Sequence, residues 1–279
     1  MSGQYSPRDQ GTPRRTGLIV VLAIFVVICV VGGILGGRYL LNTYTQISDV
    51  QNSQDIIPKL PEGTDASANQ TAKQPANAQD VQEGTVDFEA LQKTNPDVYA
   101  WIYIPGTHVN YAVCQSAERN DYYLTHAADG SESQVGAIFS EAQFNHKDFS
   151  DRVTVLYGHN GYADVMFSDL HNYELQDYLD AHDKIYVYTP AKVRTYKVFS
   201  TFSAGDRHIM DAFDLTSDKG FENFVNYVKS PESLDAHVTN VQIDADDKIL
   251  VLSTCNTGAL ESQGRYLVCG VLVDEQATA

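Results

Sequence analysis

The chain has 279 residues, of which 43% are hydrophobic and 20% charged, and its formal net charge at pH 7 is -17. This composition is too apolar for a disordered protein and too polar for a protein with many membrane spans. Residues 1–84 contain 6 Lys and Arg against 7 Asp and Glu, so nearly all of the negative charge lies in residues 85–279. A surface this acidic repels phosphate groups, which argues against nucleic acid as a partner.

The first predicted element is the uncharged run LIVVLAIFVVICVVGGILGG at residues 18–37. At about 1.5 Å per residue, a helix of this length crosses the roughly 30 Å hydrocarbon core of a bilayer. A cleaved signal peptide would have a shorter apolar region, about 7–15 residues, followed by a cleavage site of small residues. The run therefore favours an uncleaved transmembrane helix.

The charges around this run predict its orientation. Arg8, Arg14 and Arg15 precede it, and few basic residues follow it. The positive-inside rule then predicts a single-pass protein of the cell membrane, with residues 1–17 in the cytoplasm and the remainder outside. Residues 38–84 are rich in Gln, Asn, Ala, Thr and Pro, which predicts a flexible extracellular stalk. Residues 85–279 are predicted to form the functional domain.

The domain is predicted to be mainly β. Asp87 is placed to cap a short helix that ends near Asn95-Pro96, and helical spacing recurs at 165–181 and 220–229. Predicted strands cover 99–104, 109–114, 136–140, 153–157, 184–188, 193–202, 249–254 and 266–273. About eight short strands with a few helices between them predict an α+β fold built on a closed, eight-stranded β-barrel with helical insertions. The continuous apolar runs ILVL and YLVCGVLV predict central strands that are covered on both faces.

Three residues with useful chemistry lie at the ends of these strands. Cys255 follows one central strand, Arg265 begins the next, and antiparallel pairing would bring the two together; His159 follows the strand 153–157. A thiolate can attack a carbonyl, an imidazole can move the proton, and a guanidinium can stabilise the oxyanion. The set suggests acyl transfer through a thioester. The alternative is that Cys255 is a buried small hydrophobe and Arg265 a surface ion-pair partner.

The other cysteines and histidines are predicted to be structural. Cys114 and Cys269 fall inside strand patterns and are expected in the core. The remaining histidines, His171 and His208 among them, fall in polar segments and are expected at the surface. The chain has no CxxC, HExxH or His-x-His motif, so no metal site is predicted.

Several motifs resemble those of the sortase family. The residues Val251-Leu252-Ser253-Thr254-Cys255, followed by Arg265, resemble the T-L-x-T-C…R signature, and YGHN at 157–160 with MFSDL at 166–170 is similar to the family's G-H segment and its M-F-x-x-L. NDYYLTH at 120–126, GAIF at 136–139 and the partly helical stretch 205–247 resemble class B sortases. The likeness covers about residues 86–275. Val251, Asn256 and His208 depart from the residues usual in the family.

The resemblance implies a Gram-positive cysteine transpeptidase that needs no metal or organic cofactor. Its partners would be secreted proteins with a C-terminal sorting signal, and a peptidoglycan precursor or a pilin would supply the acceptor amine. Cys255 would attack the Thr carbonyl of an Asn-Pro-x-Thr-type signal, His159 would be the general acid and base, and Arg265 would hold the oxyanion. The positions that would bind the signal are Asn120, Leu124, Ser253, Thr254 and Ile209.

Three alternatives remain open. A pilin-polymerising sortase would use a Lys side chain of another subunit as its acceptor. A cysteine protease with the same three residues would hydrolyse its thioester instead of transferring the acyl group. A membrane-tethered binding module would carry Cys255 as an inert, buried residue.

Overall fold

The computed structural model describes residues 14–51, 56–58, 60–61, 82–161, 164–255 and 264–278. The chain divides into two units, Met1–Tyr44 and Thr45–Ala279, which are described separately. The helices are α1 (Arg14–Gln51), α2 (Phe88–Thr94), η3 (Tyr122–Leu124), η4 (Ser168–Glu174), α3 (Gln176–Ala181), α4 (Ile209–Ala212) and α5 (Asp218–Lys229), where η marks a 3₁₀ helix. The strands are β1 (Ile56–Pro58), β2 (Gln82–Gly84), β3 (Val98–Tyr103), β4 (Asn110–Cys114), β5 (Ile138–Phe139), β6 (Val153–Tyr157), β7 (Lys184–Tyr188), β8 (Lys192–Ala204), β9 (His237–Val238), β10 (Ile249–Cys255) and β11 (Arg265–Ala277).

The helix α1 contains the predicted membrane segment. Its stretch Ile19–Leu41 has 23 residues with a mean hydropathy of 3.2, which is long and apolar enough to cross a membrane. The helix continues to Gln51, past the expected end at residue 37. The sequence from Arg38 to Gln51 has no Gly or Pro, and a helix that has already nucleated propagates readily through such residues.

The segment 38–84 is more ordered than its composition predicts, in the parts that the structure describes. Beyond the helical residues, β1 pairs in parallel with β2. Leu60 packs against a core cluster of the domain, and Pro61 is buried. The flexible extracellular stalk predicted for 38–84 stays a prediction, and residues 62–81 lie outside the described residues. The division at residue 84 stays a prediction.

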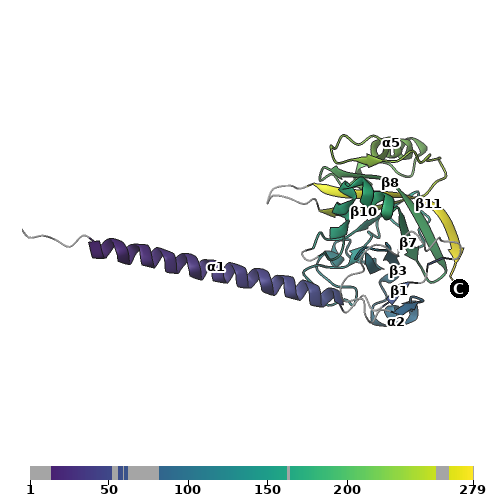
Figure 1. Ribbon diagram of the computed structural model, residues 1–279. Helices are drawn as coiled ribbons and strands as arrows, with labels where there is room; N and C mark the ends of the chain where they lie inside the picture. Colours follow the sequence, from purple (N-terminus) through teal and green to yellow (C-terminus); the bar gives the residue numbers. More distant parts are fainter. Residues whose placement is uncertain are drawn as a thin grey trace, which may run out of the picture. The chain divides into compact units, whose positions relative to one another are not determined.

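Eight strands close into a barrel (Figure 1). Their order is β11-β10-β6-β5-β4-β3-β7-β8, and antiparallel pairing of β8 with β11 completes the ring. The two-residue strand β9 pairs with β8 outside this ring. Each of the eight predicted strands is present, so the mainly β barrel with helical insertions is confirmed. Closure leaves β10 with a hydrogen-bonded neighbour on each side, β6 in parallel and β11 antiparallel.

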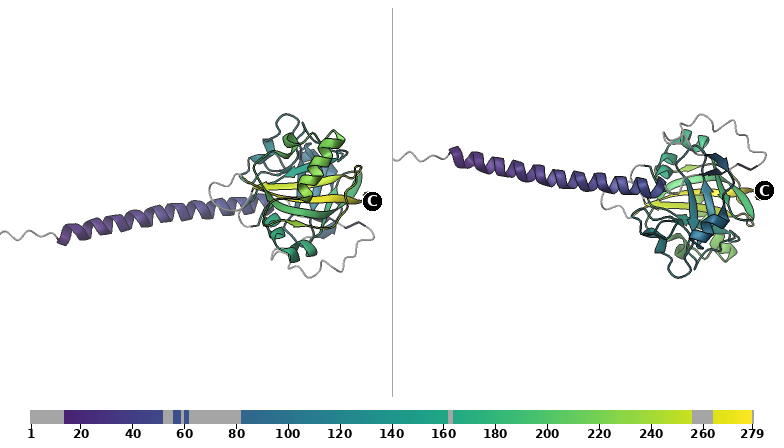
Figure 2. Two further views of the ribbon diagram at one scale, coloured as in Figure 1. Left: turned by 90° about the horizontal axis from the view of Figure 1, so that it is seen from above. Right: turned by 90° about the horizontal axis from the view of Figure 1, so that it is seen from below.

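The strand β10 is buried on both faces, as its apolar run predicts. Leu250 and Leu252 belong to one core cluster, to which all eight barrel strands contribute. Val251 points to the opposite face, because side chains alternate along a strand. There it packs in a second cluster with Phe221 and Phe224 of α5. Seen from above, α5 lies across the strands at the C-terminal end of the chain (Figure 2, left). A strand held in this way is a rigid support for the residue at its end.

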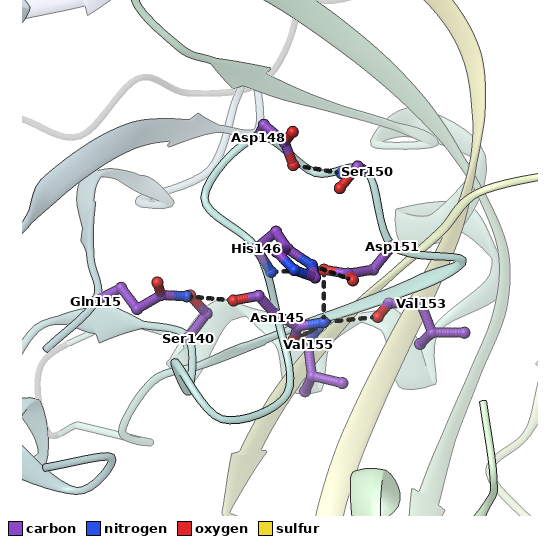
Figure 3. Close-up of polar contacts among 9 residues, drawn as sticks. All are labelled: Gln115, Ser140, Asn145, His146, Asp148, Ser150, Asp151, Val153 and Val155. Carbon is purple, nitrogen blue, oxygen red and sulfur yellow. Dashed lines mark hydrogen bonds and ion pairs between the residues drawn. The ribbon is translucent and has the colours of Figure 1, made fainter. Parts of the chain in front are cut away.

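A buried amide fixes the loop that leads into β6. Figure 3 shows Asn145 at the centre of this loop. Its Nδ2 donates to Val153 O at 2.8 Å, its Oδ1 accepts from Val155 N at 3.0 Å, and its backbone oxygen accepts from Gln115 Nε2 at 2.9 Å. Asparagine side chains in loops stabilise local backbone in this manner. The start of β6 is therefore anchored, and the far end of β6 leads directly to His159.

Candidate active site

Cys255 and Arg265 face each other across two paired strands. Cys255 is the last residue of β10, Arg265 is the first of β11, and the antiparallel register pairs them directly. The Cys255 thiol is exposed, and Arg265 Nη1 lies 3.8 Å from its sulfur. The antiparallel pairing on which the sequence argument depended is thus present. Because Cys255 has the same parity as Val251 and Ser253, it lies on the outer face of the barrel wall, where the strand leaves the core.

The parallel register between β6 and β10 brings His159 to the same place. Tyr157 pairs with Ser253, and Gly158 N donates to Ser253 O at 3.1 Å. Continuing this register by two residues places position 159 next to position 255. His159 Nε2 donates to Leu124 O at 2.8 Å. This contact fixes the neutral ring in the tautomer whose other nitrogen, Nδ1, is the hydrogen-bond acceptor.

One pocket contains all the residues singled out from the sequence. Asn120 and Leu124 come from the segment around η3, Ile209 begins α4, and Ser253 and Thr254 precede the cysteine in β10. The pocket also has on its wall the three residues at the strand ends, Cys255, His159 and Arg265. Five separate segments of the chain therefore meet at one pocket. The inert, buried cysteine of the binding-module alternative does not fit this exposed thiol.

A polar cluster that sequence reasoning missed lines the same pocket. His208 Nε2 lies 2.8 Å from Glu141 Oε2, and Tyr157 OH lies 3.3 Å from the same nitrogen. Burial raises the pKa of Tyr157 above its usual range, and the carboxylate of Glu141 raises it further. Tyr157 is therefore a neutral phenol that can donate a hydrogen bond. Glu141 gave no signal in the sequence because its partners are distant in the chain.

The expectations for the remaining cysteines and histidines have mixed outcomes. Cys114 and Cys269 are fully buried, as predicted, and burial raises the pKa of both thiols. The prediction that His171 is a surface residue is wrong, because its side chain is only 11% exposed and its Nε2 donates to Cys255 O at 2.9 Å. His182 is also buried, and its Nδ1 donates to Pro105 O at 2.9 Å.

The described residues contain no group of three or more His, Cys, Asp or Glu side chains that could hold a metal ion. A thiol, an imidazole and a guanidinium at the ends of adjacent strands can perform nucleophilic attack, proton transfer and oxyanion stabilisation.

Comparisons with known proteins agree with this arrangement. The Sortase domain family matches residues 102–273. Sortase B of Listeria monocytogenes is 33% identical over 190 residues, which cover 67% of this chain and 74% of that protein. The Staphylococcus aureus sortase B-substrate complex matches with a TM-score of 0.59 at 27% identity, over 67% of this chain and 84% of that chain. Sortase B from B. anthracis matches with a TM-score of 0.59 at 30% identity, over 67% and 83% of the two chains. The chain belongs to the sortase family of cysteine transpeptidases, and its similarity is to the sortase B members of that family.

Proposed function

We propose that this chain cleaves a sorting signal of the Asn-Pro-x-Thr type after its Thr and transfers the protein to an amine of the cell wall. The observation that carries the proposal is the direct pairing of Cys255 with Arg265 in the pocket that His159 also lines. Cys255 ends β10, Arg265 begins β11 and His159 follows β6, and the fold brings the three together at one edge of the barrel.

In the first half of the reaction, Cys255 Sγ passes its proton to Nδ1 of His159 and attacks the carbonyl carbon of the Thr. Arg265 supports the negative charge that develops on the carbonyl oxygen, because its Nη1 already lies 3.8 Å from the sulfur. His159 donates a proton to the departing amine as the C–N bond breaks, which leaves the Thr acyl group on the sulfur as a thioester.

In the second half, an acceptor amine attacks the thioester. His159 takes a proton from this amine, and the C–S bond breaks to release Cys255 and an amide product. The neutral tautomer selected by Leu124 O makes Nδ1 the basic atom for this step. Catalytic hydrogen bonds commonly shorten only when substrate is bound, so a small rotation of the ring toward Cys255 is expected on binding.

The pocket supports recognition of a short, mostly uncharged peptide. Leu124 is 40% exposed, although it is a large apolar residue, and it offers a surface for an apolar substrate side chain such as Pro. Asn120 can donate and accept hydrogen bonds, which suits the amide of a substrate Asn. Ser253, Thr254 and Ile209 line the remaining wall and are proposed to contact the residues near the scissile bond.

We further propose that α1 anchors the enzyme in the cell membrane, with residues 1–17 in the cytoplasm and the catalytic domain outside. The apolar stretch Ile19–Leu41 and the basic residues before it support this topology. Substrates that emerge from secretion would then meet the enzyme at the membrane surface.

The test uses the full chain in detergent micelles with a peptide that contains Asn-Pro-x-Thr. Mass spectrometry follows the products with and without a short oligoglycine amine, and Cys255→Ala is the control. The proposal predicts an amide product that depends on the added amine and is absent with Cys255→Ala. Formation of the acid alone, whatever amine is present, would establish a hydrolase, and transfer only to a Lys side chain of a folded domain would establish a pilin polymerase.

A further inference from the structure

His171 forms a hydrogen bond to the backbone of Cys255, the candidate nucleophile. Its Nε2 donates to Cys255 O at 2.9 Å, and the same atom lies 3.3 Å from Nδ2 of Asn160, the residue that follows His159. Its side chain is 11% exposed, so the imidazole is held in the protein interior beside the pocket. It contacts the nucleophile through the backbone carbonyl.

This contact extends the hydrogen-bond ladder of the sheet by one step. Alternate carbonyls of a strand point to the same side, so Ser253 O and Cys255 O both point toward β6. Ser253 O accepts from the backbone N–H of Gly158, the residue just after β6 ends. Cys255 O accepts from the His171 side chain instead. The imidazole of His171 therefore supplies the hydrogen bond that the next residue of a neighbouring strand would supply. Without it, the Cys255 carbonyl would have no partner from β6.

Neighbouring residues hold the His171 side chain in place. It lies in η4, where the neighbouring Leu170 and Tyr173 are fully buried in the barrel core. Its ring packs against that of Tyr266, with ring centroids 4.9 Å apart, and its Nδ1 lies 3.5 Å from Glu174 Oε1. The ring contact with Tyr266 and the Glu174 carboxylate beside Nδ1 restrict the ring's orientation, so its N–H is aimed at the carbonyl before any substrate arrives.

We propose that His171 is a positioning residue for Cys255. By holding the carbonyl of the last residue of β10, it fixes the backbone from which the thiol projects and thereby holds Sγ beside Arg265. The inference rests on the proposed function of Cys255 as the nucleophile, and it assigns His171 no contact with the substrate.

The size of the effect follows from geometry. A displacement of about 1 Å at a reacting atom can cost about 10²-fold in rate, even when the substituted residue does not touch the substrate. Loss of the His171 bond would act on the position of Sγ and leave the substrate-binding wall in place. We therefore expect kcat to fall about 10- to 100-fold, with KM changed less than about threefold.

Two substitutions of His171 by amides of different length distinguish a positioning role from a general effect on stability. In His171→Gln the side-chain amide reaches to about where Nε2 lies, so the bond to Cys255 O can be kept. In His171→Asn the amide is one methylene shorter and falls short of the carbonyl. Both are measured in the full chain in detergent, with a Cys29→Ser background so that Cys255 is the exposed thiol among the described residues. His237 is a matched control, because its Nε2 also donates to a backbone carbonyl, that of Glu174 at 2.9 Å.

The expected result is kcat within about threefold of the parent for His171→Gln, a 10- to 100-fold lower kcat for His171→Asn, and little change for His237→Asn. The rate at which iodoacetamide alkylates Cys255 is a second readout that needs no substrate, and it should differ between His171→Asn and the parent. Equal kcat for the two His171 variants, or unchanged alkylation in both, overturns the inference. If the parent transfers no peptide but alkylation still separates the variants, the proposed function fails while the positioning role stands.

Discussion

Replacement of Arg265 by Lys tests the oxyanion role with the least change in charge. Arg265 Nη1 lies 3.8 Å from Cys255 Sγ and also donates to Gly264 O at 3.4 Å, so one guanidinium contacts both the nucleophile and the adjacent backbone. A Lys ammonium is a single point charge on a flexible chain and cannot reproduce this planar array of donors. The positive charge near the thiol is retained in Arg265→Lys, while the directed donor is lost.

The two possible roles of Arg265 predict rates that differ by orders of magnitude. Loss of one well-placed oxyanion donor typically lowers the rate about 10²- to 10³-fold, or about 3–4 kcal/mol in transition-state stabilisation. A surface ion pair contributes less than about 1 kcal/mol to stability and nothing to rate. We therefore expect a reduction of at least about 100-fold in Arg265→Lys, with the free energy of unfolding nearly unchanged.

Single-turnover acylation by a peptide with the scissile Thr bond is the measurement, because it isolates the step in which the oxyanion forms. Arg152→Lys is the control, since Arg152 forms an ion pair with Asp218 in which Nη2 and Oδ1 are 2.6 Å apart, and it does not line the pocket. Near-normal acylation by Arg265→Lys would refute the oxyanion role and require another donor for the same oxygen.

Three further predictions follow from the site and its support. Cys255→Ala should abolish cleavage and transfer but change the free energy of unfolding by less than about 0.5 kcal/mol, because Cys255 is exposed; residual turnover in mass-spectrometric assays would contradict this. Gly158→Ala should destabilise the protein by about 1–3 kcal/mol in urea unfolding and also slow acylation, because the new Cβ would lie 2.7 Å from Phe167 Cδ2, directly before the histidine at 159. The hydrogen bond to Asp169 raises the pKa of His108 above 6.5, so its stabilising effect should be complete below about pH 6.5 and disappear as the pH rises through the raised value. The difference in unfolding free energy between the parent and His108→Gln should therefore shrink with rising pH, and a difference that grows would show the opposite sign.

The barrel could be predicted from the sequence because its signals are local. Apolar runs with few polar interruptions mark β6, β10 and β11, and the predicted bounds of β6 are those observed. The start of helix α2 was also predicted from a local signal, the capping residue Asp87. In the structure Asp87 Oδ1 accepts from Ala90 N at 2.9 Å, as an N-cap does. The catalytic candidates were found because each lies at the end of such a strand and belongs to a recognisable motif.

The other residues at the site could not be predicted, because their positions depend on contacts between segments that are distant in the sequence. His171 lies in a 3₁₀ helix among polar residues, and its burial comes from Tyr266, which is nearly 100 residues away in the sequence. The pair formed by Glu141 and His208 likewise joins two loops that meet only in the folded barrel. The sequence also placed the end of α1 too early, because the polar residues after the apolar run do not stop a helix that is already formed.

The burial of β10 on both faces sets the proposed nucleophile apart from most of the residues proposed to bind the signal. Cys255 and Arg265 are fixed by strand pairing, whereas Asn120, Leu124 and Ile209 come from short helices and the segments around them. Exchange of these loop-borne residues changes the shape of the pocket without altering the register that aligns the thiol with the guanidinium. The residues of the short helices and loops can therefore be substituted without disturbing the paired strands. For the proposed function, this means that signal preference can change by exchange of loop residues while the pairing of Cys255 with Arg265 is kept.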